Sequence, residues 1–251
     1  ARPAPVVPRR LALAFLAMGL RPAQAAEVAR LGVVSVMGDV ITVVTHRPET
    51  GSRVDQNQTQ QVALGEQGFD RFATQAAIEQ ARRAWPAAEV LGLELAPRAE
   101  IEAGGWLQAQ RFAPPAAILS RLEADGITHL LLLTRHRAEA LLRLRGNSVG
   151  SGHLEGLGFY VDRALPVRRV DTGELGQGFL APFAYFQVAL IEVAGGRVLA
   201  AETLTASSSA SAARGTKGLD PWDALDPAQK VAALQRLIRS ELVRVIPQMI
   251  R

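Results

Sequence analysis

The sequence predicts an α/β fold, in which one mixed β-sheet of about six to eight strands is combined with three helices. An α+β arrangement is the alternative. The first observation is that residues 31–37 and 40–46 are rich in Val and Ile and flank Gly38-Asp39, a dipeptide suited to a tight turn. Strand-like and helix-like segments then alternate as far as residue 134, and the chain closes with a long helical pattern. We therefore expect a fold that starts with a β-hairpin and ends in an amphipathic helix.

The middle of the chain predicts a parallel crossover. Residues 69–85 have the spacing of a helix, and Pro86 ends it. A short strand over 89–95 and a helix over 115–125 follow. Residues 127–134 (ITHLLLLT) are apolar almost throughout, which is typical of a central strand covered on both faces. Strands that alternate with helices in this way are expected to run parallel.

The last third of the chain predicts a hairpin, a linker and a helix. Residues 184–193 and 197–206 form two strand-like segments around a Gly-Gly turn. Residues 207–223 are rich in Ser, Ala and Gly and are expected to be a mobile linker. Asp226 is a suitable N-cap, because Pro227 follows it and Gln229 completes a capping box. The expected buried stripe consists of Val231, Leu234, Ile238, Leu242, Val245 and Met249.

Residues 1–25 have the pattern of a cleaved signal peptide. Arg9 and Arg10 precede an unbroken apolar run of ten residues, and Ala23-Gln24-Ala25 supplies the small residues of a cleavage site. Ten residues rise only about 15 Å as a helix, about half of the bilayer core, so a membrane anchor is disfavoured. We expect export to the periplasm or beyond, with cleavage after Ala25, and leave open the general secretory or the twin-arginine route. Residues 26–251 then form a single globular domain.

Removal of this segment changes the charge balance. The chain has 28 Lys and Arg against 24 Asp and Glu, and residues 1–25 contain four Arg and no acid, which leaves 24 bases against 24 acids. A broad basic surface is therefore not expected, and neither is nucleic acid as a partner. The chain has no cysteine, which excludes disulfides, thiolate metal ligands and a Cys nucleophile. No second apolar run of membrane-spanning length follows, so the mature form is expected to be soluble.

Residues 146–162 (GNSVGSGHLEGLGFYVD) contain five glycines and are the most unusual segment. A nucleotide-binding loop is disfavoured, because the glycine spacing is wrong, no Lys-Ser or Lys-Thr is present, and a strand follows where a helix should begin. The segment more simply predicts a twisted strand pair with bulges that need glycine. A serine-hydrolase elbow is also disfavoured, because the G-x-S-x-G spacing is absent.

The candidate binding residues lie in two segments. His153 and Glu155 share one face if the glycine-rich segment is extended, and a His-x-Glu pair is able to ligate a metal or to act as acid and base. No third ligand lies near them in the sequence, so a polar loop contact is the alternative. Ser151 and Gly152 precede this pair and belong to the same candidate surface.

His46 and Arg47 complete the candidate set. They end the second predicted strand and lead into residues 47–67, a polar segment expected to be an exposed loop. Together with Thr50-Gly51-Ser52, the pair is suited to binding an anion, with a solvated loop as the alternative. His129 lies within an apolar strand and is expected to be a hydrogen-bonded core histidine rather than a ligand.

The segments GVVSVMGDVITVV and GSGHLEGLGFYVD together resemble exported proteins of Gram-negative bacteria that have no known function. The resemblance spans most of the predicted mature chain. It implies a periplasmic location but supplies no activity and no site residues. The predicted layout is also similar to small envelope α/β modules that help to assemble secretion or wall-synthesis machinery, a likeness of architecture only.

These observations favour an exported cell-envelope protein that acts as a non-enzymatic binding or assembly module. Its expected partner is an envelope protein or a small ligand, and no cofactor or metal is expected. The alternative is an exported hydrolase or metal-dependent enzyme that uses His153 and Glu155. A structural or stress-related factor without a ligand is a third reading. The oligomeric state stays open.

Overall fold

The computed structural model of the protein describes residues 29–38, 40–47, 57–63, 68–94, 105–108, 111–144, 147–168, 175–211 and 220–250. The predicted signal peptide, residues 1–25, lies outside the described residues. The described part of the chain contains three α-helices, which are α1 (Gly68–Ala84), α3 (Ala116–Ala124) and α4 (Pro227–Met249). Twelve strands form one mixed sheet, and two more form a small hairpin. The predicted α/β class, the three helices and the C-terminal amphipathic helix are thus confirmed.

The strands vary greatly in length. They are β1 (Arg30–Val36), β2 (Val40–Thr45), β3 (Gln58–Ala63), β4 (Glu89–Gly92), β5 (Leu107–Gln108), β6 (Arg111–Phe112), β7 (His129–Arg135), β8 (Arg137–Glu139), β9 (Leu142–Leu144), β10 (Asn147–Val149), β11 (His153–Arg168), β12 (Leu175–Glu192), β13 (Arg197–Ser207) and β14 (Ala210–Ser211).

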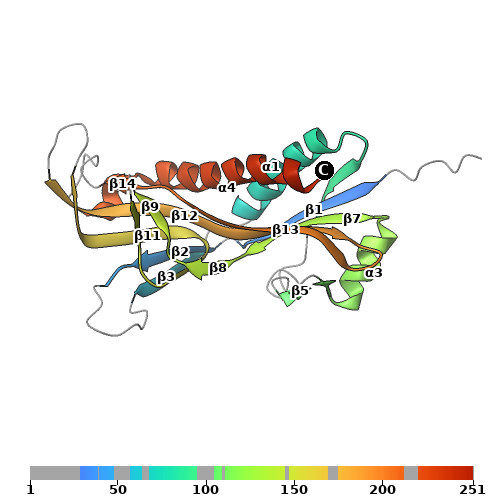
Figure 1. Cartoon of the computed structure of the whole chain (residues 1–251), viewed down its shortest axis with the longest axis horizontal. Coiled ribbons are helices and arrows are strands. Elements are labelled where there is room, and N and C mark those ends of the chain that lie inside the picture. The colour runs from blue at the N-terminus through green and yellow to red at the C-terminus, as the bar shows by residue number, and fades with distance from the viewer. Residues whose placement is uncertain are drawn as a thin grey trace, which may run out of the picture.

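Strand β12 is the spine of the sheet. Along one edge it pairs with β11 through residues 175–185 and then with β7 through residues 186–192, both antiparallel. Its other edge pairs with β13 and β14. Outside this centre, β1 pairs with β7 and β2 pairs with β11, both parallel, and β3 closes one edge next to β2. Figure 1 shows the resulting elongated sheet.

The first two predicted strands are confirmed, but their predicted pairing as a hairpin is wrong. β1 runs parallel to β7 and β2 runs parallel to β11, and both β7 and β11 are antiparallel to β12. β1 and β2 therefore point in the same direction and follow one another along the sheet (Figure 1). Gly38 has a φ of 79°, as a tight turn would also require. Here it shifts the chain from one pairing partner to the next without reversing it.

Three apolar clusters hold the layers together. The helix-side core lies between the sheet and helices α1 and α4, and its buried residues include Leu131, Leu133, Phe159, Val188, Leu234 and Leu242. The α3-side core lies on the opposite face at one end, and includes Val34, Trp106, Leu122, Leu130, Leu132 and Ile191. The β8-side core lies on that same face at the other end, and includes Val44, Leu154, Tyr160, Phe179, Phe183 and Tyr185. Figure 1 shows α1 and α4 on one side of the sheet and α3 on the other.

The parallel crossover is also confirmed. β4 and β7 both pair in parallel with β1, and α3 lies between them in the sequence. In β7, Leu131 and Leu133 face the helix-side core while Leu130 and Leu132 face the α3-side core. This alternation explains the nearly unbroken apolar run, because both faces of the strand are covered.

The C-terminal elements follow the sequence pattern closely. β12 and β13 form the predicted hairpin. The Asp226 Oδ1 atom accepts a hydrogen bond from the Gln229 backbone nitrogen at 2.8 Å, and Gln229 Oε1 accepts one from the Asp226 nitrogen at 3.0 Å, so the capping box is present. The predicted stripe is buried except for Val231, which is 39 % exposed. None of the helices in the described ranges is long and apolar enough to cross a membrane.

The predicted linker, residues 207–223, overlaps several described elements. Residue 207 ends β13, residues 210–211 form β14, and a 3₁₀ helix, η3, covers Pro221–Ala224. Residues 212–219 lie outside the described ranges, so a mobile linker stays a prediction.

Candidate functional site

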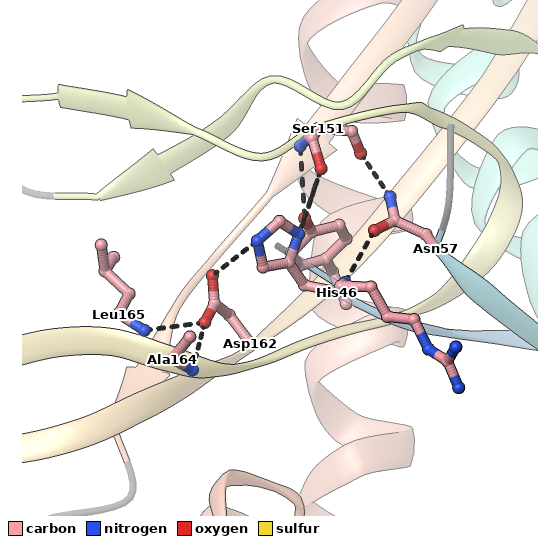
Figure 2. A network of polar contacts seen from close by, with 8 residues as sticks. His46, Asn57, Ser151, Asp162, Ala164 and Leu165 are labelled. Atoms are coloured by element: carbon pink, nitrogen blue, oxygen red, sulfur yellow. Dashed lines mark hydrogen bonds and ion pairs between the residues drawn. The ribbon is translucent and has the colours of Figure 1, made fainter. Parts of the chain in front are cut away.

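A polar network lies where β2 ends beside β11. His46 directly follows β2, and its backbone nitrogen donates a hydrogen bond to the Val161 carbonyl at 2.8 Å. This bond continues the parallel β2–β11 ladder by one residue and fixes the position of the imidazole. Figure 2 shows the network around His46, with Ser151 and Asn57 on one side and Asp162 on the other.

The Nδ1 atom of His46 faces two hydroxyl groups. It lies 3.0 Å from the Tyr160 hydroxyl and 3.1 Å from Ser151 Oγ. Tyr160 is fully buried, and its hydroxyl also accepts a hydrogen bond from the Ser151 backbone nitrogen at 3.2 Å. When the His46 proton is on Nε2, Nδ1 is able to accept a hydrogen bond from either hydroxyl. The three side chains therefore join β2, β11 and the turn at Ser151.

Asp162 faces the other ring nitrogen. Its Oδ2 atom is 4.0 Å from His46 Nε2, which is within ion-pair range but beyond a hydrogen bond. Its Oδ1 atom accepts hydrogen bonds from the backbone nitrogens of Ala164 at 2.7 Å and Leu165 at 2.9 Å (Figure 2). Only 8 % of Asp162 is exposed, and these two bonds supply the hydrogen-bond partners that a buried carboxylate needs.

Asn57 connects the two segments that the sequence singled out. Its Nδ2 atom donates a hydrogen bond to the Ser151 carbonyl at 2.7 Å, and its Oδ1 atom accepts one from the Arg47 backbone nitrogen at 3.2 Å. Arg47 itself is exposed. The end of β2, the start of β3 and the glycine-rich segment thus meet at a single point on the surface.

The turn at Ser151 depends on the glycines on either side of it. Gly150 has a φ of 126° and Gly152 a φ of 76°, values that side chains with a Cβ rarely adopt. A Cβ on Gly150 would also lie 2.6 Å from the Ala140 carbonyl oxygen. The glycine-rich segment forms β10 and the start of β11, with Gly150 to Gly152 as the sharp connection. Both parts are strands as predicted, but β10 pairs with β9 and β11 pairs with β2, β8 and β12, so the two do not form a pair with each other.

His153 and Glu155 occupy a different place from the one around His46. They belong to β11 where it pairs with β8, opposite Glu139 and Arg137 respectively. Both are exposed, whereas Leu154 between them is buried in the β8-side core. They share a strand face as predicted. Among the described residues, no group of three His, Asp or Glu side chains is arranged to hold a metal ion.

The structure brings together some of the candidate residues and adds others. His46, Arg47 and Ser151 meet in the network, and the Gly152 carbonyl accepts a hydrogen bond from the Ala140 nitrogen at 2.9 Å nearby. Sequence reasoning missed Asn57, Tyr160 and Asp162. The only available signal was that Tyr160 and Asp162 stand two apart in a strand and so share a face. They contact His46 only because β2 pairs with β11, and the paired residues are more than one hundred positions apart in the sequence.

His129 is partly buried at the start of β7 and does not belong to the network. Its Nδ1 atom lies 3.0 Å from Thr128 Oγ1, and its ring meets Trp85 edge-to-face with centroids 5.1 Å apart. Burial lowers the pKa of His129, and the nearby Glu192 carboxylate acts in the opposite direction. Both contacts fit a structural histidine.

The network contains the three residue types of a serine nucleophile and its base. His46 Nδ1 is close enough to accept the Ser151 proton, and Asp162 faces the far ring nitrogen. Two features differ from a committed catalytic arrangement. Asp162 Oδ2 lies 4.0 Å from His46 Nε2, too far for a hydrogen bond. Tyr160 also competes with Ser151 for the Nδ1 atom of His46. The contacts accordingly brace the turn at Ser151.

No family model matches the chain. No curated protein matches it either. Among solved structures, the chain is similar to a DUF330 protein from Xanthomonas campestris, with a TM-score of 0.40 and 13% identity over 88% of this chain and 82% of that one. It is similar to PelC from Paraburkholderia phytofirmans, crystallised as a dodecamer, with a TM-score of 0.32 and 12% identity over 89% and 90% of the two chains.

A third similar structure comes from Helicobacter pylori and is described as a homologue of neuraminyllactose-binding hemagglutinin. Its TM-score is 0.36, with 8% identity over 88% of this chain and 81% of that one. At these TM-scores the likeness does not extend to a shared function or a shared site.

Proposed function

We propose that the protein is exported to the cell envelope and works there as a non-enzymatic module that binds a partner protein or a small ligand. The observation that carries this proposal is the junction at Ser151. Two segments expected to form contact surfaces, residues 47–67 and 146–162, are joined there by Asn57 and His46. Residues 58–63, predicted as part of an exposed loop, form the exposed strand β3 instead. The junction therefore consists of strand ends and a turn held on a rigid sheet, which is a common basis for recognition.

The chemistry of the junction favours an anionic group on the bound molecule. The exposed Arg47 follows His46 directly, and its backbone is held by Asn57. A guanidinium group binds carboxylate or phosphate through two parallel hydrogen bonds. Ser151 is partly exposed, and its hydroxyl, beside His46, supplies a further polar contact.

A pull-down with matched variants tests the binding proposal. The protein is immobilised and exposed to an envelope extract, and the retained molecules are compared with those of Arg47→Ala and Ser151→Ala. Arg137→Ala, an exposed arginine on β8, serves as the control. We expect a retained molecule that both site variants lose and the control keeps. Retention of nothing, or equal retention by all variants, would contradict the proposal.

Export is tested by the N-terminus of the protein recovered from the envelope. Cleavage after Ala25 predicts a mature chain that starts at Ala26, which mass spectrometry identifies directly. Recovery of a chain that still contains residues 1–25 would refute export with cleavage after Ala25.

A second candidate function, an exported serine hydrolase, is favoured by the 3.1 Å separation of Ser151 Oγ and His46 Nδ1. In that reaction Ser151 Oγ would attack the acyl carbon of an ester or amide while its proton passes to His46. The bond from that carbon to the alcohol or amine would then break, the leaving group would take the proton from His46, and water would hydrolyse the acyl group from Ser151. A fluorophosphonate probe, which labels activated serines, separates the candidates. Labelling of the wild type that disappears in Ser151→Ala and in His46→Ala supports the hydrolase, whereas an unlabelled Ser151 excludes it.

A further inference from the structure

Charge is unevenly distributed over the molecule. Helices α1 and α4 together contain seven Lys and Arg against three Asp and Glu, although residues 26–251 as a whole are balanced. One of the three acids, Asp70, is directed inward, where it accepts hydrogen bonds from Ser35 and from the backbone of Met37 and Gly38. Glu241 is paired with Arg244. The outer surface of the two helices is therefore basic.

The basic side chains are spread along both helices. Arg82 and Arg83 are exposed in the last turn of α1, and Arg236, Arg239 and Arg244 are exposed on the C-terminal half of α4. The two helices lie side by side on the same face of the sheet (Figure 1). They are in contact through Arg239, whose guanidinium lies 5.3 Å from the centroid of the Phe72 ring. These exposed arginines of the two helices are here called the arginine face. Within it, Arg244 is paired with Glu241, and Arg82 also donates a hydrogen bond to the Val90 carbonyl.

An apolar residue stands among these cations. Val243 is 48 % exposed, and it follows Arg236 by seven residues and Arg239 by four, so the three share one side of the helix. The opposite side of α4 faces the sheet with Leu234, Ile238 and Leu242 fully buried. The helix therefore has no second apolar stripe with which to enter a bilayer, and a contact through this face would be peripheral.

We propose that the arginine face docks on an anionic phospholipid surface. Cations dispersed over two helices, rather than converging on a pocket, suit headgroups that diffuse and adjust their spacing. A folded acidic protein would instead need carboxylates fixed at matching positions. Clusters of four to eight Lys or Arg bind anionic membranes through additive contributions of each charge. Val243 adds a small apolar contact at the headgroup level.

Vesicle co-sedimentation tests this proposal. The protein from Ala26 on, which includes every described element, is mixed with vesicles of equal parts phosphatidylglycerol and phosphatidylcholine, or of phosphatidylcholine alone. We expect binding only to the anionic vesicles. We also expect the binding to fall as NaCl is raised from about 0.1 M to about 1 M, because the screening length shortens from about 10 Å to about 3 Å.

Matched variants identify the face that binds. Arg83→Gln with Arg236→Gln is expected to weaken vesicle binding about tenfold or more. Arg111→Gln with Arg137→Gln removes the same charge from β6 and β8, away from the helices, and should leave binding nearly unchanged. Equal loss in both pairs, or no binding to anionic vesicles, overturns the proposal. Arginine-dependent binding to poly-glutamate without vesicle binding would also overturn it and would indicate an acidic protein.

Discussion

At the scale of single residues, Gly158 marks the closest approach in the sheet. It lies in β11 between β2 and β12, opposite Thr42 and Phe183. A Cβ at this position would stand 2.0 Å from the Thr42 carbonyl oxygen and 2.6 Å from Phe183 Cζ. The backbone oxygen has no way to move aside without breaking the parallel ladder, so the absence of a side chain is a packing requirement here.

Gly158→Ala should therefore destabilise the protein by about 2–4 kcal/mol, because the methyl group forces the two strands apart. Urea unfolding followed by circular dichroism measures the difference. Gly105→Ala is the matched control, since within the described ranges no atom beyond its chain neighbours lies within 4 Å of the added Cβ, and its effect should stay within about 0.5 kcal/mol. Similar midpoints for the two variants would show that the β2–β11 contact is able to relax.

The candidate site shows what single residues in a sequence reveal. Ser151 could be selected because it lies between two glycines, and His46 and Arg47 because they stand where an apolar strand gives way to a polar segment. Tyr160 and Asp162 could not, because they occupy ordinary strand positions and acquire their roles from a strand pairing across distant segments. The predicted binding residues as a set stay predictions, with His153 and Glu155 placed on the exposed side of β11.

At the scale of elements, helix α1 stabilises the break between β1 and β2. Asp70, in its first turn, accepts hydrogen bonds from Ser35 Oγ at 2.5 Å and from the Met37 nitrogen at 2.8 Å through Oδ1, and from the Gly38 nitrogen at 2.8 Å through Oδ2. The Met37 carbonyl accepts a hydrogen bond from Arg135 Nε. The strand changes partners at this point, and side chains from α1 and β7 replace the missing ladder bonds.

Asp70→Asn tests this role. An amide keeps the shape but turns one acceptor into a donor, so at least one N–H at the break loses its partner, at a cost of about 1–3 kcal/mol. Glu79→Gln is the control, because it makes the same change from carboxylate to amide on the exposed side of the same helix. Thermal unfolding of both variants at neutral pH provides the comparison. Equal stability of the two variants would show that the Asp70 carboxylate does not stabilise the break between β1 and β2.

Elements with their own local signals were predicted well. The start of α4 follows from Asp226, Pro227 and Gln229, and the β12–β13 hairpin follows from its glycine turn. The hairpin predicted around Gly38-Asp39 was wrong because a glycine with positive φ is compatible both with a tight turn and with a kink that does not reverse the chain. Only the partners β7 and β11, which lie far along the chain, decide between the two outcomes.

At the scale of the whole molecule, β12 is the element that all three cores share. Val188 faces the helix-side core, Ile191 the α3-side core and Phe183 the β8-side core. Alternating residues of one strand therefore connect layers that otherwise lie on different faces and at different ends of the sheet. This arrangement predicts that the cores unfold together rather than one after another.

Phe183→Ala tests that cooperativity. It removes a fully buried ring from the β8-side core, a change that typically costs about 3–5 kcal/mol. Trp106 reports on the α3-side core when Trp85 and Trp222 are both replaced by Phe in the reference protein and in the variant. We expect the urea midpoint seen by Trp106 to fall together with the midpoint seen by circular dichroism. A Trp106 transition that does not move would mean that the two ends unfold independently.

The placement of β1 and β2 also fixes the order in which the sheet can be completed during synthesis. Arg30, at the start of β1, and its hydrogen-bonding partner Thr128, next to β7, are separated by 98 positions. A ribosome therefore releases the apolar β1 strand long before the strand that covers its edge exists. The wait of β2 for β11 is longer still, whereas β12 directly follows β11. β3 and β4 follow early enough to pair with one edge of β2 and of β1, but the other edge of each strand stays unpaired until β11 and β7 have been synthesised. The sheet is complete only after β12 has emerged.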